Sequence, residues 1–257
     1  MAIYTTEITS DTLDSDNPIH QRLIKAYYLA QPYIDGDLLE VGCGTGRGIA
    51  LLQPRCQRYL AIDKIGKVLE QLEAVYPQVE FMQMNIPPMT KLPDNSFDRV
   101  VSFQVIEHIK DDLTFLREIK RVLKPGGFAL ITTPNIKFTL TRNPWHQREY
   151  QSHKLQKLAE EVFNKVQIMG IAGNEKVMDY YYQNKQSVER ITRFDVFDFQ
   201  HRMPASLLRI PYDILNRVNR RRLQKQDKQL VTDITHEDYI LVEEGAKGLD
   251  LFCILTK

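Results

Sequence analysis

Residues 38–48 read LLEVGCGTGRG, a hydrophobic run that passes directly into three glycines at alternate positions. The run is typical of a short buried strand, and the glycines that follow it mark a turn into a helix. Because glycine carries no side chain, the backbone groups at Gly42, Gly44 and Gly46 can approach a ligand closely. The stretch therefore predicts a strand, a ligand-binding turn and a helix that starts near Arg47.

Short apolar runs alternate with helical patterns along the rest of the chain. The predicted strands lie at residues 38–41, 59–62, 79–82, 99–102, 128–132, 166–171 and 249–255. Helical spacing of hydrophobic residues is clear at residues 112–123, and a further helix at residues 20–30 precedes the first strand. This alternation is typical of an α/β protein with a doubly wound, Rossmann-like and mostly parallel sheet.

The pattern changes between the last two predicted strands. Residues 174–236 are rich in Tyr, Phe and Arg, and they develop no second alternation of strands and helices. A connection of that length needs structure of its own. We therefore predict a main domain formed by residues 1–173 and 237–257, with a largely helical insertion or cap at residues 174–236.

Composition places the chain among ordinary globular proteins. It has 257 residues, of which 43% are hydrophobic and 26% are charged. A formal charge of +1 gives no electrostatic reason to expect a partner nucleic acid. The sequence shows neither a signal peptide nor an apolar run of bilayer length, and its three cysteines are far apart, so we expect a cytoplasmic protein.

Two carboxylates indicate which class of ligand the glycine turn would bind. Glu40 ends the first predicted strand, where it would repel a pyrophosphate but attract a cationic amino group or sulfonium. Asp63 ends the second predicted strand, where a carboxylate can accept hydrogen bonds from both hydroxyls of a ribose. The dinucleotide fingerprint would place a glycine where Arg47 stands. The spacing favours a nucleoside with a positive, amino-acid-like tail over a dinucleotide.

Five motifs follow one another in a single order along the chain. They are EVGCGTG at residues 40–46, Asp63, NSFD at residues 95–98, IEH at residues 106–108 and RVLKPGG at residues 121–127. With these motifs, residues 21–135 resemble the class I S-adenosylmethionine-dependent methyltransferases, and in particular the group of ubiquinone and menaquinone biosynthesis enzymes. The resemblance implies S-adenosylmethionine as the cofactor and a sheet of seven strands, the last of them antiparallel.

The resemblance also implies a set of cofactor-binding residues. The glycine turn would hold the methionine end, the second strand the ribose, and residues 84–86 the adenine, with two further side chains beside the sulfonium. The full set is Glu40, Gly42, Cys43, Gly44, Thr45, Gly46, Asp63, Met84, Asn85, Ile86, Phe103 and Gln104. Many relatives carry an aspartate at or beside the adenine position, where this chain has Asn85.

Two segments offer candidate catalytic residues, and we take His108, His146 and Tyr150. His108 follows the fourth predicted strand and could accept a proton from the methyl acceptor, or could only stabilise its loop together with Glu107. Residues 141–150 hold the only tryptophan, two arginines, a histidine and a tyrosine, which resembles a substrate-recognition loop. The alternative for this loop is a rigid lid. The histidines and carboxylates show no metal-ligand spacing, so the sequence predicts no metal site.

The two segments that leave the sheet at its carboxyl edge would meet over the transferred methyl group. They are the loop at residues 142–150 and the predicted insertion. We expect them to form a pocket lined by Trp145, His146, Tyr150 and some of residues 180–182.

A basic segment lies within the predicted insertion. Residues 202–228 carry eight basic side chains, and their apolar residues recur at helical spacing on one side. We take the segment as a cap helix with a solvated face, and the alternative is peripheral contact with an anionic membrane surface.

These observations predict an enzyme. It would transfer a methyl group from S-adenosylmethionine to oxygen, nitrogen or carbon of a small-molecule acceptor, for which an aromatic or lipid-like compound would suit the aromatic insertion. Two alternatives stay open. One is a nicotinamide-dependent oxidoreductase, and the other is a non-catalytic protein that binds S-adenosylmethionine without turning it over.

Overall fold

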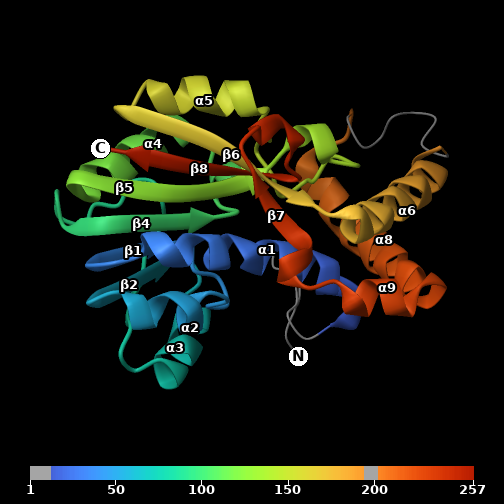
Figure 1. The fold of residues 1–257 in the computed structure, drawn as a ribbon, viewed down its shortest axis with the longest axis horizontal. Helices are drawn as coiled ribbons and strands as arrows, with labels where there is room; N and C mark the ends of the chain where they lie inside the picture. The colour runs from blue at the N-terminus through green and yellow to red at the C-terminus, as the bar shows by residue number, and fades with distance from the viewer. Residues whose placement is uncertain (1–12, 194–201) are drawn as a thin grey trace.

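Helices cover both faces of a single sheet in the structure, a computed structural model that describes residues 13–193 and 202–257 (Figure 1). The strands are β1 (Asp37–Val41), β2 (Arg58–Asp63), β3 (Glu80–Gln83), β4 (Phe97–Phe103), β5 (Leu123–Pro134), β6 (Lys165–Gly173), β7 (Tyr239–Val242) and β8 (Asp250–Thr256). The helices are α1 (Asn17–Ala30), α2 (Ile49–Leu52), α3 (Gly66–Val75), α4 (Asp112–Val122), α5 (Ser152–Glu160), α6 (Glu175–Thr192), α8 (Ala205–Gln226) and α9 (Lys228–Asp233).

The sheet has the strand order β3-β2-β1-β4-β5-β8-β6-β7 within the described residues. The pairs from β3 to β5 are parallel, whereas β8 runs antiparallel between β5 and β6, and β7 pairs antiparallel with β6. The doubly wound, mostly parallel α/β fold is thereby confirmed. Among residues 13–193 and 202–257 the sheet has eight strands rather than the expected seven, because residues 239–242 add an edge strand against residues 170–173.

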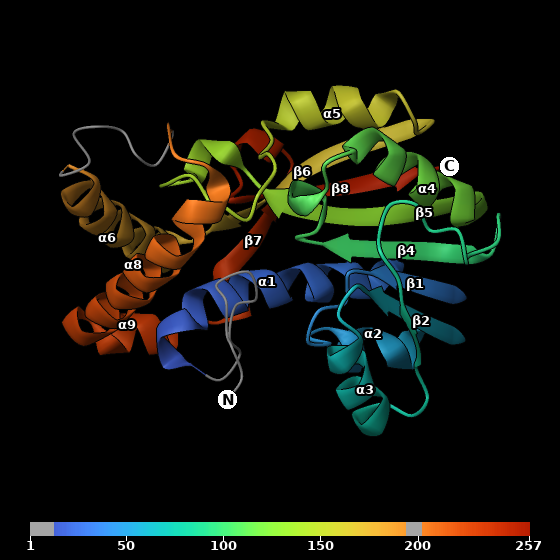
Figure 2. The ribbon, with the colours of Figure 1, turned by 180° about the vertical axis from the view of Figure 1, so that it is seen from behind.

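The central strands are buried on both faces, which explains their unbroken hydrophobic runs. Along β2, Tyr59 and Ala61 enter a core shared with α1 and α3, while Leu60 and Ile62 enter a second core with α4 and α5. Figure 2 shows α4 and α5 from the side opposite to the view in Figure 1. Ligands of such a sheet bind at the carboxyl ends of its parallel strands, where the glycine turn follows β1.

Two helix boundaries differ from the sequence prediction. The helix predicted from Arg47 begins at Ile49, because Gly46 adopts a φ of 76° that a right-handed helix excludes. It ends at Leu52 after a single turn. The helix predicted at residues 112–123 ends at Val122, and the next residue already begins β5 without an intervening turn.

The segment between β6 and β7 supplies α6, α8 and α9, which gather at one end of the molecule (Figure 1). Residues 194–201 of the predicted insertion lie outside the described part of the chain. The division into a main domain and a cap stays a prediction. No helix among the described residues is long and apolar enough to cross a bilayer.

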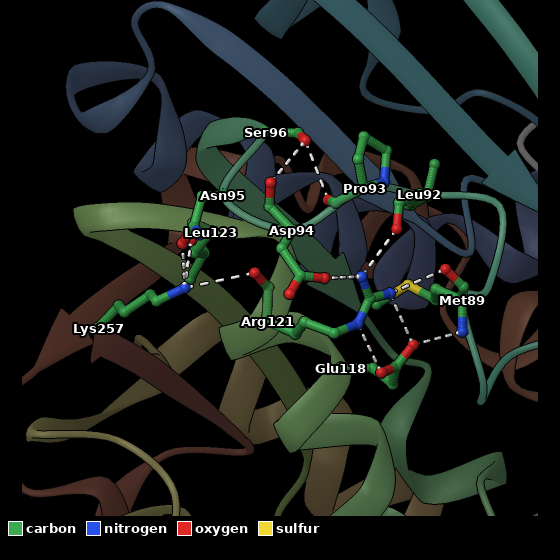
Figure 3. A network of polar contacts seen from close by, with 10 residues as sticks. All are labelled: Met89, Leu92, Pro93, Asp94, Asn95, Ser96, Glu118, Arg121, Leu123 and Lys257. Atoms are coloured by element: carbon green, nitrogen blue, oxygen red, sulfur yellow. Dashed lines mark hydrogen bonds and ion pairs between the residues drawn. The ribbon is translucent and has the colours of Figure 1, made fainter.

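Arg121 fastens the loop that follows β3 to helix α4 (Figure 3). Its Nη1 donates to the Leu92 carbonyl at 2.8 Å and to Asp94 Oδ1 at 2.6 Å, while Nη2 donates to the Met89 carbonyl at 2.9 Å. Glu118 completes the arrangement, because its carboxylate accepts from Arg121 Nε at 2.8 Å and from the Met89 backbone N–H at 2.7 Å. The guanidinium therefore gives the Leu92 carbonyl a donor and adds a second donor to the Met89 carbonyl, which also accepts from the Leu92 backbone N–H at 3.0 Å.

Replacing Arg121 with alanine should lower the free energy of unfolding by about 1–3 kcal/mol, because the partly buried Leu92 carbonyl loses its donor and Glu118 loses its ion-pair partner. Urea unfolding of the variant beside Arg117→Ala measures this change. Arg117 lies exposed on the same helix, and its loss should alter the stability by less than about 0.5 kcal/mol. Equal effects of the two substitutions would contradict the role given to Arg121.

Candidate functional site

The glycine turn adopts a backbone that side chains would disfavour. Gly42, Gly44 and Gly46 have φ values of 79°, 51° and 76°. A Cβ atom on Gly42 would lie 2.5 Å from a methyl of Val105, and one on Gly46 would lie 2.6 Å from a methyl of Leu72. A Cβ atom on Gly44 would meet no atom within 4 Å. Gly42 and Gly46 therefore permit close packing, whereas Gly44 lies beside open space.

Asp63 joins this turn to the turn that follows β2. Its Oδ2 accepts from the Gly44 backbone N–H at 2.9 Å, and its Oδ1 accepts from the Ile65 backbone N–H at 3.0 Å. The residue is buried but lines the cavity described below. Because each carboxylate oxygen can accept more than one hydrogen bond, both retain capacity for a ligand.

Glu40 lies beneath the turn and is 1% exposed. Tyr27 and Tyr59 donate their hydroxyls to its two oxygens, at 2.7 Å and 2.6 Å. Burial raises the pKa of Glu40, an effect that the two tyrosine hydrogen bonds oppose. The Tyr27 ring packs edge-on against Phe103, and a Cβ atom on Gly48 would clash with it at 1.7 Å. Glu40 thus holds α1 and β2 against the turn.

A cavity of about 540 Å³ extends from the glycine turn to α6 and α8. Nine of the twelve predicted cofactor residues line it: Gly42, Cys43, Gly44, Thr45, Asp63, Asn85, Ile86, Phe103 and Gln104. Three do not, because Glu40 is covered by tyrosines, Gly46 packs on Leu72 and Met84 lies in the hydrophobic core. Among the residues that sequence reasoning missed are Tyr27 and Tyr59, which hold Glu40.

Glu107 lines the cavity from the loop that follows β4. It is 1% exposed, and its Oε2 accepts from the Thr133 hydroxyl at 3.0 Å. Burial raises the pKa of Glu107 to about 7, although the nearby His146 opposes this rise. Its backbone carbonyl accepts from the Gln147 backbone N–H at 2.7 Å. Glu107 therefore holds residues of the 141–150 loop against the sheet.

The hydrogen bonds of His146 define its tautomer. Asn143 Oδ1 accepts from the Trp145 backbone N–H at 3.0 Å, so Asn143 Nδ2 is the atom that faces His146 Nε2 at 2.8 Å. His146 Nε2 is then an acceptor, and its Nδ1 donates to Glu149 Oε1 at 2.7 Å. His146 lines the cavity, but both of its ring nitrogens are engaged within the loop.

His108 has the opposite arrangement. Its Nδ1 lies 3.0 Å from the Trp145 carbonyl, which can only accept, so Nδ1 carries the proton. In the neutral ring this leaves Nε2 as the nitrogen that can take up a proton. His108 lines the cavity, and its ring packs edge-on against that of His146 with centroids 4.9 Å apart.

Two of the predicted acceptor-side residues lie outside the cavity lining. Tyr150 is buried in the core and donates its hydroxyl to Asp112 at 2.8 Å. Trp145 donates from Nε1 to Asp213 at 3.3 Å, and the Arg209 guanidinium lies 4.2 Å from its ring centroid. Trp145 thus connects the loop to α8, as a rigid lid would. Of the tyrosines at positions 180–182, the first two line the cavity.

Glu107, His108 and His146 bring one candidate metal-ligating atom each to within 4.8 Å of the others. Hydrogen bonds already occupy both ring nitrogens of His146, and Glu107 accepts from Thr133. These hydrogen bonds account for the closeness of the three side chains, which together form part of the cavity lining. The sequence-based expectation of no metal site stays a prediction.

Part of the chain is similar to known methyltransferases. Residues 39–131 match the family model of a methyltransferase domain. A probable S-adenosylmethionine-dependent methyltransferase of Mycobacterium tuberculosis is 38% identical over 160 residues, which are 60% of this chain and 58% of that protein. A ubiquinone biosynthesis O-methyltransferase of Paracidovorax citrulli is 27% identical over 103 residues, 38% of this chain and 43% of that protein. The chain thus spans about half the length of the curated relatives it matches.

A solved structure shares the fold over nearly the whole chain. It is a possible histamine N-methyltransferase from Thermotoga maritima, with a TM-score of 0.56 and 15% identity, and the match covers 93% of this chain and 92% of that one. At this identity the likeness shows the fold alone.

The raised pKa of Glu107 predicts a pH-dependent stability. The folded protein keeps this proton up to about pH 7, whereas a glutamate in an unfolded chain releases it near 4.5. The protonated Glu107 carboxyl therefore stabilises the folded protein fully below pH 4.5, and this stabilisation is lost as the pH rises to 7. The glutamine of Glu107→Gln cannot titrate. As the pH rises from 4.5 to 7, the free energy of unfolding of this variant should therefore increase by roughly 3 kcal/mol relative to that of wild type.

Urea unfolding at several pH values between 4.5 and 7.5 measures this difference. Glu73→Gln removes an exposed carboxylate on α3 and should keep the wild-type pH profile. If Glu107→Gln and wild type gave parallel profiles, the carboxyl would not be buried as described.

Proposed function

We propose that the chain is a methyl-transferring enzyme of the class I S-adenosylmethionine-dependent kind, because residues 39–131 match the family model of a methyltransferase domain. Its substrate would be a small-molecule acceptor, methylated at oxygen, nitrogen or carbon. One observation carries the proposal: the glycine turn and Asp63 line the same cavity as His108 and two tyrosines of α6. We call the part of this cavity that His108 and the tyrosines line the chamber. Cofactor and acceptor can therefore occupy adjacent space.

The lining residues fit the proposed cofactor. Gly44 leaves room for a ligand against the backbone, and Asp63 presents two carboxylate oxygens that suit a ribose diol. Asn85 and Ile86 line the cavity beyond Asp63, where an adenine would lie. In this proposal Glu40 and Met84 support the turn and the strand ends from behind and do not touch the cofactor. The sulfonium of S-adenosylmethionine supplies an activated methyl group.

The protein's part in the transfer is to align the reactants and exclude water. The loop at residues 141–150, held to α8 through Trp145, closes one side of the chamber. His108 is the residue we propose as a proton acceptor, because Nε2 is its basic nitrogen and the side chain lines the chamber. A base is required only where the acceptor is a hydroxyl or a protonated amine. We do not assign this role to Tyr150 or His146.

The alternatives make different predictions for ligand binding. A nicotinamide-dependent oxidoreductase would need a pyrophosphate to lie at a turn that carries Arg47 in place of the third glycine. A non-catalytic binding protein would hold S-adenosylmethionine without consuming it in the presence of an acceptor. The geometry of the chamber beside the turn favours catalysis over binding alone.

Asp63→Ala should weaken the binding of S-adenosylhomocysteine by about tenfold or more, because a carboxylate that holds ribose hydroxyls makes charge-assisted hydrogen bonds. Calorimetry gives the dissociation constant. Since Asp63 also joins two turns, the melting temperature without ligand is recorded to show that the variant is folded.

Glu80→Ala is the matched control, because Glu80 is a carboxylate of the neighbouring strand that pairs with Arg58 away from the cavity. It should bind S-adenosylhomocysteine as wild type does, and NAD should not bind to any of the three proteins. Binding of NAD, or an unchanged affinity in Asp63→Ala, would contradict the cofactor assignment.

We further propose that α8 contacts an anionic membrane surface from the cytoplasmic side. Four apolar residues follow one side of the helix and are each more than half exposed: Leu207, Ile210, Ile214 and Val218. Arg221, Arg222 and Lys225 are exposed along the last turns of the same helix. Exposed apolar side chains beside a cluster of cations match the acyl chains and anionic headgroups of a bilayer.

Co-sedimentation with lipid vesicles tests this contact. Wild type should bind vesicles that contain phosphatidylglycerol and not vesicles of phosphatidylcholine alone, and added salt should weaken binding. The double substitution Ile210→Asp, Ile214→Asp should abolish it. Ile240→Asp, at another exposed apolar position on β7, should leave it intact. A wild-type protein that stays in the supernatant with both kinds of vesicle would overturn the proposal.

A further inference from the structure

One end of the cavity is not accounted for by the cofactor. It lies between α1, α6 and α8, and the residues that line it include Arg22, Tyr180, Asn184, Asn216 and Arg220. These helices contribute no acidic side chain to the described lining of the cavity. The polar groups at this end are therefore mostly hydrogen-bond donors.

The two arginines are only partly neutralised. Arg220 Nη1 lies 3.1 Å from Asp16, but the same carboxylate also pairs with Arg217 at 3.1 Å. Arg22 Nε lies 3.2 Å from Asp250. Both carboxylates are fully buried and absent from the lining, so they lie behind the guanidiniums. Asp250 and Glu149, a lining residue of the 141–150 loop, both act on Arg22. Arg217 and Arg220 share the single Asp16 carboxylate, which leaves the positive charge of this end on the side of Arg220.

A buried hydrogen-bond chain orients an amide toward the same space. The Ser187 hydroxyl donates to Asn219 Oδ1 at 2.6 Å, and Asn219 Nδ2 donates to Asn184 Oδ1 at 2.7 Å. The Asn184 oxygen is thereby used, so its Nδ2 is the group left for a ligand. Asn216 Nδ2 is also a buried donor, and the residue lines this end of the cavity beside Tyr212.

We propose that Arg22, Asn184, Asn216 and Arg220 form an anion pocket that binds a carboxylate or phosphate group of the methyl acceptor. This inference rests on the proposed function, since the anion belongs to the molecule that is methylated. Guanidinium and amide N–H groups are the donors that proteins use for such oxyanions. Tyr180, Tyr181 and Tyr212 line the same end and offer apolar ring faces to the body of the acceptor.

The anion pocket explains how an acceptor would be oriented. It lies among the helices, whereas His108 and the turn that would hold the cofactor line the part of the cavity built on the strands. An acceptor held at its anionic end would therefore extend its other end toward the methyl group. A neutral acceptor of the same shape would leave buried donors without partners, which proteins discriminate against strongly.

The test uses three matched probes with the full chain in saturating S-adenosylhomocysteine. They are 4-hydroxybenzoate, 4-hydroxyphenyl phosphate and the neutral 4-hydroxybenzamide. Calorimetry should show that at least one anionic probe binds about tenfold or more tightly than the amide. The tighter of the two anions identifies the carboxylate or the phosphate as the acceptor's group.

Arg220→Gln should reduce this preference by about tenfold, because it removes the charge and the fork of donors from the pocket. Arg217 still neutralises Asp16 in this variant. Asn184→Leu removes a donor without changing charge and should also reduce the preference. Arg221→Gln, an exposed neighbour on the same helix, should preserve it.

The outcomes separate the two proposals. Failure of the wild-type chain to bind S-adenosylhomocysteine would contradict the proposed function itself. Normal binding of S-adenosylhomocysteine, together with no binding of any probe, would overturn the anion pocket alone. So would equal binding of the three probes, or a preference that Arg220→Gln retains.

Discussion

The carboxylate of Asp63 holds together the two turns on which the cavity is built. By accepting from the backbone of Gly44 and of Ile65, it keeps the carboxyl ends of β1 and β2 in one arrangement and still faces the cavity. The alternating glycines make that arrangement attainable, because their positive φ values turn the chain without side chains in the way.

Buried polar groups connect the strand ends to the surrounding helices and loop. Glu40 draws α1 onto the turn through Tyr27, and α1 in turn presents Arg22 to the far end of the cavity. Glu107 holds the 141–150 loop through its backbone carbonyl, and Trp145 connects that loop to α8. The helices after β6 therefore line one part of the cavity, and the ends of the strands line the other. This continuity supports the proposal that cofactor and acceptor are bound next to each other.

The sequence predicted those parts of the structure that depend on local pattern. Strands buried on both faces appear as continuous apolar runs, and the glycine turn is visible because positive φ requires glycine. β7 escaped notice because it is short, partly exposed at the sheet edge and directly follows helices. The role of Glu40 could not be seen either, since its partners lie 13 and 19 residues away on different elements. Arg22 and Arg220 line one cavity only after the chain has folded, and no spacing in the sequence predicts that they lie close together.

A crystal structure of the chain with S-adenosylhomocysteine tests the central claim most directly. The account predicts the ribose hydroxyls on Asp63, the adenine beside Asn85 and Ile86, and the homocysteine part over residues 42–45, with the sulfur facing the chamber that His108 lines. A ligand bound elsewhere, or one whose sulfur faces away from that chamber, would contradict it.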